Sequence, residues 1–108
     1  MAKLDLPQGT LDLLVLQVLS AGEMHGWGVA QKLSLLSNDA LQLQEGTLYP
    51  ALQAMEMKGW VKSEWRLSPT KRRARYYSIT PSGRKQLTAE ARDFDQVVAA
   101  VSRVMKPA

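Results

Sequence analysis

The chain has 108 residues, no cysteine and one histidine, with a formal net charge of +4 and a pI of about 9.6. One domain of this size buries a core without metals or disulfides, and the composition excludes a disulfide framework and a cysteine zinc site. The charged N-terminus, interrupted by Pro7, is not a signal peptide, and no apolar run is long enough to span a bilayer. We therefore expect a cytoplasmic protein that has no cofactor, does not associate with membranes and is not an enzyme.

Two helices are predicted in the first third of the chain. The first begins at an N-cap, Thr10, and ends at residues 21–22. Its apolar residues form a wide stripe of Leu11, Leu14, Val15, Val18 and Leu19. Leu13 and Leu16 lie off this stripe, which suggests burial by a partner subunit as well as by the helix's own domain.

The second predicted helix opens within residues 24–28 and runs to about Leu36. Val29, Leu33 and Leu36 form its inner stripe, and Trp27 is a large apolar anchor near its start. We expect His25, the single histidine, to pack or to form a hydrogen bond at this helix start. Residues 41–44 alternate apolar and polar side chains, which predicts a very short strand.

A third helix is predicted within residues 44–59. Leu48, Leu52 and Met55 recur at i, i+4 and i+7, a stripe that faces a core. Thr47 is the expected N-cap, which places Pro50 at the third helical position, where a missing N–H is tolerated. Gly59 supplies the C-terminal stop.

A basic hairpin follows this helix. Residues 60–67 and 73–79 predict two strands, joined by a turn over residues 68–72. Residues 58–85 hold nine Lys and Arg against one Glu, whereas residues 1–57 carry a net charge of −4 and residues 86–108 are neutral. This concentration of charge is typical of a polyanion-binding surface, although a solvated hairpin without function is the alternative.

The last predicted helix begins with Thr80 as N-cap and Pro81 at the first helical position. Beyond it a heptad seam contains Leu87, Ala91, Phe94, Val98, Val101 and Met105. Such a seam is typical of a helix that pairs with a second helix, so we expect a homodimer, with packing inside one chain as the alternative. The fold expected from these elements is mainly α with a small β-hairpin: a winged helix-turn-helix over residues 1–80 and a C-terminal dimerisation helix over residues 81–108.

Four segments in this order resemble the PadR family of bacterial transcriptional regulators. They are LPQGTLDLLVL at residues 6–16, MHGWG at 24–28, EGTLYPAL at 45–52 and RARYYSITPSGR at 73–84. The single closing helix resembles the short subgroup of that family. Trp27 is a departure, because the family pattern usually has Tyr there, and an indole cannot make the contacts of that hydroxyl.

The resemblance implies that the third helix reads double-stranded DNA in the major groove. With its apolar stripe turned inward, the helix presents Thr47, Tyr49, Pro50 and Gln53 to the DNA. Gln53 pairs well with adenine, and Thr47 or Pro50 with a thymine methyl group. Because the helix contains no arginine, we expect modest direct readout and more weight on apolar contacts and DNA shape.

In the hairpin, Lys71, Arg72, Arg73 and Arg75 are the expected contacts to phosphates or the minor groove. Tyr76 and Tyr77 point to opposite faces, so one fills the core and the other lies outward. The resulting hypothesis is a repressor that binds a pseudo-palindromic operator as a homodimer. A winged-helix module that binds RNA or a protein partner is the alternative.

The resemblance also implies release by a small apolar or aromatic effector, held between the closing helices of two subunits. Trp27 and Phe94 are the candidate effector-binding residues. The alternative for Phe94 is that it only packs in the helix seam.

Overall fold

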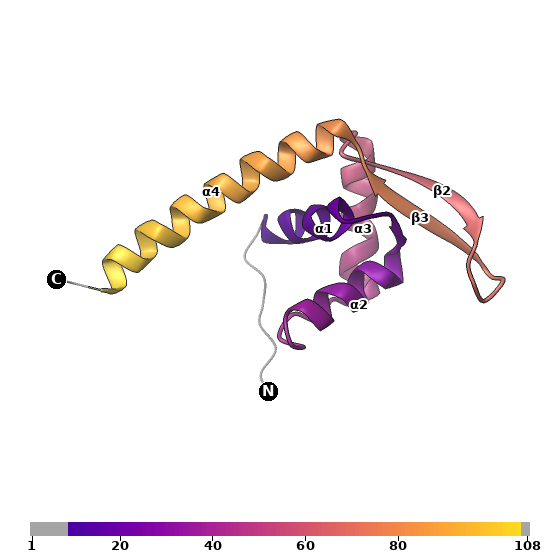
Figure 1. Cartoon of the computed structure of the whole chain (residues 1–108), viewed down its shortest axis with the longest axis horizontal. Coiled ribbons are helices and arrows are strands. Elements are labelled where there is room, and N and C mark those ends of the chain that lie inside the picture. Colours follow the sequence, from indigo (N-terminus) through magenta and orange to yellow (C-terminus); the bar gives the residue numbers. More distant parts are fainter. Residues whose placement is uncertain (1–8, 107–108) are drawn as a thin grey trace.

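Four helices and three strands make up the part of the chain described by the computed structural model, residues 9–106 (Figure 1). They are α1 (Thr10–Ser20), β1 (Met24–His25), α2 (Gly26–Leu36), α3 (Glu45–Met57), β2 (Val61–Leu67), β3 (Arg73–Ile79) and α4 (Pro81–Met105). Leu6, Pro7 and Gln8, which open the first of the four resembling segments, lie outside the described residues. The expected fold, a winged helix-turn-helix with a long closing helix, is confirmed.

The three strands form one antiparallel sheet in the order β1-β3-β2. Strands β2 and β3 pair from Val61 opposite Ile79 to Leu67 opposite Arg73, which makes the predicted hairpin. The prediction of a strand at residues 41–44 is wrong, since these residues have no strand structure. The additional strand is β1, which pairs with Tyr76 and Tyr77 of β3. A strand of two residues is too short to produce an alternating pattern in the sequence. It is recognised only by its pairing with the edge of β3 that β2 leaves free.

The core lies between the three N-terminal helices and the base of the hairpin. Its buried residues are Val15, Leu16, Val18, Leu19, Val29, Leu33, Leu48, Leu52, Met55, Val61 and Tyr77. The predicted stripe of α3 is confirmed in full, and Tyr77 is the tyrosine that fills the core. Leu16, placed off the stripe of α1, is fully buried by its own chain. Leu36 is 66% exposed and Trp27 is 55% exposed, so the inward role predicted for these two residues is wrong.

Two helices begin earlier than predicted. Thr10 is the first residue of α1, and Gly9, with φ of 90°, takes the N-cap position. Helix α3 starts at Glu45 after Gln44, because the Gln44 carbonyl already accepts from the backbone N–H groups of Thr47 and Leu48. Pro50 is therefore the sixth helical residue, and because it has no N–H it cannot form the helical hydrogen bond to the Gly46 carbonyl. Gly46 is exposed, so water can reach this carbonyl.

The other predicted helix ends are confirmed. At the end of α3, Gly59 has φ of 81°, the Gly59 N–H donates to the Glu56 carbonyl, and the Trp60 N–H donates to the Met55 carbonyl. This pair of bonds is the Schellman motif that glycine favours. At the start of α4 the Thr80 hydroxyl accepts from the Gly83 N–H, and Pro81 occupies the first turn.

Helix α4 leaves the body of the domain along its length. Its first turns contact α1 and β3, whereas residues 92–106 are all exposed. Figure 1 shows its C-terminal half extending away from the other helices, which lie at the hairpin end of the molecule.

Candidate nucleic-acid interface

The outer surface of α3 carries the residues predicted for recognition. Thr47, Pro50 and Gln53 are exposed, and Tyr49 is 37% exposed at the edge of the helix. Leu48, Leu52 and Met55 are buried on the opposite side, which fixes the rotation of the helix. The predicted orientation of the four recognition residues is therefore what the structure has, although Thr47 lies inside the helix and is not its cap.

Tyr49 lies directly against the start of α2. A β-carbon built on Gly26 would come within 2.5 Å of Tyr49 Cε1 and 3.1 Å of its hydroxyl oxygen. Only a residue without a side chain allows the ring to lie this close. Gly26 therefore has a part in placing Tyr49, which the sequence pattern did not indicate.

His25 starts α2 in the way predicted. Its Nδ1 accepts a hydrogen bond of 2.9 Å from the Gly28 N–H, and its ring stands edge-on to Tyr76. Among the described residues there is no group of three or more His, Cys, Asp or Glu side chains placed to hold a metal. The role of His25 is thus a helix cap.

The two faces of the hairpin differ in chemistry. Alternation along the paired strands puts Ser63, Trp65, Leu67, Arg73 and Arg75 on one face, and Glu64, Arg66, Ala74 and Tyr76 on the other. We call the first set the aromatic–arginine face. It continues from the buried Tyr77, so it lies on the same side of the sheet as the core and α3.

The central cation of the second face, Arg66, is paired. The guanidinium of Arg66 donates two hydrogen bonds of 2.6 Å to Glu23, lies 2.6 Å from Glu64, and stacks over the ring of Tyr76. Hydrogen bonding to Arg66 lowers the pKa of Glu23, and the same contact raises the pKa of Arg66. Arg66 therefore contributes little free positive charge to a polyanion, and the exposed Lys62 is the cation of this face for which the described residues show no ion pair.

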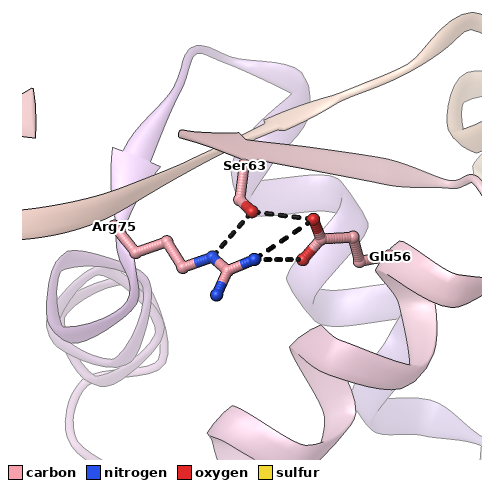
Figure 2. Close-up of polar contacts among 3 residues, drawn as sticks. All are labelled: Glu56, Ser63 and Arg75. Carbon is pink, nitrogen blue, oxygen red and sulfur yellow. Dashed lines mark hydrogen bonds and ion pairs between the residues drawn. The ribbon is translucent and has the colours of Figure 1, made fainter. Parts of the chain in front are cut away.

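Arg75 is joined to α3 across the aromatic–arginine face. Figure 2 shows Arg75 of β3, Ser63 of β2 and Glu56 of α3 converging on one another. Arg75 Nε donates to Ser63 Oγ at 2.7 Å, Ser63 Oγ donates to Glu56 Oε2 at 2.8 Å, and Arg75 Nη2 lies 3.4 Å from both carboxylate oxygens. Arg75, predicted as a wing contact, is thus partly neutralised by Glu56. Sequence inspection missed Glu56 and Ser63, because only the strand register brings them together.

The turn of the hairpin and the start of β3 hold three further cations. Lys71, Arg72 and Arg73 are exposed, and within the described chain no ion pair is found for them, whereas Arg66 and Arg75 are paired. Lys71 has φ of 65°, and the turn is closed by hydrogen bonds between Ser68 and Arg72. The Arg73 guanidinium lies 5.4 Å from the centre of the Trp65 ring. These three side chains are the cations of the hairpin best placed to meet phosphates.

A hollow of about 700 Å³ lies between the start of α2, the Tyr49 side of α3 and the hairpin. We call it the wing hollow; Trp27, Tyr49, Trp65, Arg72 and Arg73 are among the residues that line it. Phe94 lies elsewhere, on the exposed part of α4. Trp27 and Phe94, the two predicted effector-binding residues, therefore lie at different places within one chain.

The predicted seam of α4 is only partly covered by the chain itself. Leu87 and Ala91 are half-buried, whereas Phe94, Val98, Val101 and Met105 are exposed, with Phe94 at 44%. Val97 and Val104 widen this apolar stripe on the same helix. Packing inside one chain thus accounts for the first third of the seam and leaves the rest uncovered.

Comparisons with known proteins agree with this geometry. The transcriptional regulator PadR-like family matches residues 15–89. Transcriptional regulator Rv3488 of Mycobacterium tuberculosis is 34% identical over 89 residues, covering 82% of this chain and 79% of its own length. Among solved structures, a transcriptional regulator from Clostridium thermocellum has a TM-score of 0.84 at 26% identity, with 92% of this chain and 96% of that chain covered. A PadR family transcription regulator from Clostridium difficile has a TM-score of 0.77 at 25% identity, covering 91% of this chain and 100% of that chain.

Proposed function

Because the chain belongs to the PadR-like family of transcriptional regulators, we propose that it is a repressor that binds a pseudo-palindromic operator as a homodimer. The family consists of transcriptional regulators and not of enzymes, and membership implies DNA binding. No helix among residues 9–106 is both long enough and apolar enough to cross a membrane.

One observation carries the proposal: Tyr49 of α3 lines the same hollow as the hairpin turn, and the three cations of that turn have no acidic partner in the described chain. On double-stranded DNA, Thr47, Tyr49, Pro50 and Gln53 then face base edges in the major groove. Lys71, Arg72 and Arg73 meet the phosphates or the adjacent minor groove, and Arg75 adds a weaker contribution. In this division of work α3 selects the sequence and the hairpin supplies affinity.

The uncovered part of the α4 seam supports the dimer. Residues 1–80 then act as the DNA-binding unit and residues 81–108 as the dimerisation helix. Two copies related by a two-fold axis would present their α3 helices to half-sites about one helical turn, ~34 Å, apart. A small apolar or aromatic effector that lodges between the paired helices near Phe94 would shift the separation of the two α3 helices and release the operator.

A competition gel-shift assay on the DNA upstream of the gene tests the proposal. We expect a discrete complex that survives an excess of unrelated duplex DNA and is removed by unlabelled upstream DNA. Equal competition by both DNAs would contradict sequence-specific binding. Preferential competition by RNA of the same sequence would favour the alternative of an RNA-binding winged helix.

A further inference from the structure

We propose that the wing hollow seats one strand of the DNA sugar–phosphate backbone, with Trp27 and Trp65 packing against deoxyribose rings and Arg72 and Arg73 meeting the flanking phosphates. This inference rests on the proposed function and adds two apolar contact residues that α3 and the hairpin cations do not include. It also gives Trp27 a part in DNA binding in place of effector binding.

The first support is the exposure of two large aromatic rings on one concave surface. Trp27 and Trp65 are each 55% exposed, although they are large aromatic side chains. Trp27 stacks on the His25 ring at 6.4 Å, and Trp65 has Arg73 and Arg75 over its ring at 5.4 and 5.9 Å. Both indoles are thus held in place before a ligand arrives, which lowers the entropic cost of binding.

The second support is charge complementarity. The cations that line the hollow are Arg72, Arg73 and Arg75, and of these Arg72 and Arg73 have no acidic partner in the described part of the chain. The acidic Glu56 lies behind Arg75, on the α3 side of the hairpin, and does not line the hollow. An occupant that alternates an apolar ring with an anionic group fits this lining, and the deoxyribose–phosphate backbone has that alternation.

The third support is position. Tyr49 of α3 and the hairpin cations Arg72 and Arg73 come from two different elements and line the same hollow. In a winged helix that has α3 in the major groove and the hairpin on the adjacent minor groove, the strand that separates these grooves passes between the two elements. The wing hollow is the space between them.

The test measures the affinity of the intact protein for a duplex of the upstream region and for an unrelated duplex of equal length. Because backbone packing is independent of sequence, Trp27→Ala and Trp65→Ala should each weaken binding to both duplexes by about the same factor, roughly tenfold. The dependence on salt should stay as in the wild type, since no charge is removed. Trp27→Phe and Trp65→Phe should recover most of the affinity.

Two variants serve as matched controls. Leu67→Ala removes an exposed apolar side chain from the same strand and face as Trp65, and Leu36→Ala does so on the same helix as Trp27; neither residue lines the hollow. We expect wild-type affinity from both. A wild-type protein that does not bind duplex DNA would defeat the proposed function itself. Normal binding by both tryptophan-to-alanine variants would overturn only this inference, as would a decrease confined to one of the two sequences.

Fluorescence supplies a second readout that a merely structural role would not change. In a Trp60→Phe background the emission comes from Trp27 and Trp65 alone. Saturating duplex DNA should protect this emission from acrylamide, a neutral quencher. Unchanged quenching would contradict the proposal. Protection by a small aromatic carboxylate such as salicylate but not by DNA would also overturn it, and would identify the hollow as an effector site.

Discussion

At the scale of single residues, Tyr77 links the core to a pH dependence. Burial raises the pKa of Tyr77 above its ordinary value of 10.0. In the unfolded chain the same hydroxyl ionises first, so the folded state loses stability as the pH rises above about 10. Tyr77→Phe should therefore flatten the alkaline decline of the free energy of unfolding, measured in urea from about pH 8 to about pH 11. An alkaline decline as steep in Tyr77→Phe as in the wild type would contradict the assignment.

Gly26 gives a second prediction at this scale. Gly26→Ala would place a methyl group against Tyr49 and should displace that ring. We expect DNA affinity to fall about fivefold, as expected for one weakened hydrogen bond or packing contact, together with a lower melting temperature. Gly46→Ala is the stability control, because its β-carbon meets nothing within 4 Å. Alanine there should raise the melting temperature or leave it unchanged. If both variants changed the melting temperature and the DNA affinity in the same way, the cause would be helix propensity and not the displacement of Tyr49.

At the scale of elements, we expect the contact between Glu56 and Arg75 to stabilise the fold and to lower DNA affinity. Both side chains are part-exposed, so the pair contributes only about 0–1 kcal/mol to folding. Glu56→Gln retains a hydrogen-bonding side chain and releases the charge of Arg75. We expect tighter DNA binding and a steeper salt dependence, by up to ~0.9 in log–log slope for each added phosphate contact. Weaker binding by this variant would instead mean that the contact holds the hairpin at its working angle to α3.

Removal of cations from the hairpin turn should have the opposite effect on the salt dependence of DNA binding. Replacing Arg72 and Arg73 with alanine should reduce the log–log salt slope by about 0.9 for each phosphate that the variant no longer neutralises. Arg84→Ala with Lys85→Ala is the matched control, since it removes the same charge from exposed positions of α4. Equal reductions in both double variants would show that net charge acts and that the hairpin makes no local contact.

Much of the fold at this scale was predictable from local pattern. The stripe of Leu48, Leu52 and Met55 fixed the rotation of α3, and Gly59 and Thr80 fixed two helix ends, because each signal lies within a few residues of sequence. The predictions failed where a distant partner decides the outcome. Strand β1 exists because β3 has a free edge, and Glu56 meets Arg75 because of the register between β2 and β3. The start of α3 was predicted too late in the sequence because Gln44 caps the helix through its backbone carbonyl. Such a contact does not require a particular side chain, so the sequence does not indicate it.

At the scale of the molecule, the seam of α4 carries the prediction of a dimer. Phe94→Asp puts a charge in the seam where its uncovered part begins, and it should give monomers by light scattering, together with weaker operator binding. Ala100→Asp adds the same charge on the same helix, off the seam, and should remain dimeric. A Phe94→Asp protein that stays dimeric would place the subunit contact elsewhere.

The division of charge explains why a dimer would be needed for tight binding. Residues 1–57, which include α3, carry a net charge of −4, whereas the positive charge is confined to residues 58–85. A single copy therefore offers one short cationic element and one weakly charged reading helix. Two copies double the phosphate contacts and allow both half-sites to be read at once.

DNA binding by α3 and the hairpin is tested most directly by the affinity of the wild-type protein for its upstream duplex, measured by fluorescence anisotropy from about 50 to about 200 mM salt. We predict a straight line of negative slope in log K against log salt, and a complex that contains two chains per operator. A flat line, or no binding to the duplex at low salt, would contradict the assignment of α3 and the hairpin as a DNA-binding surface.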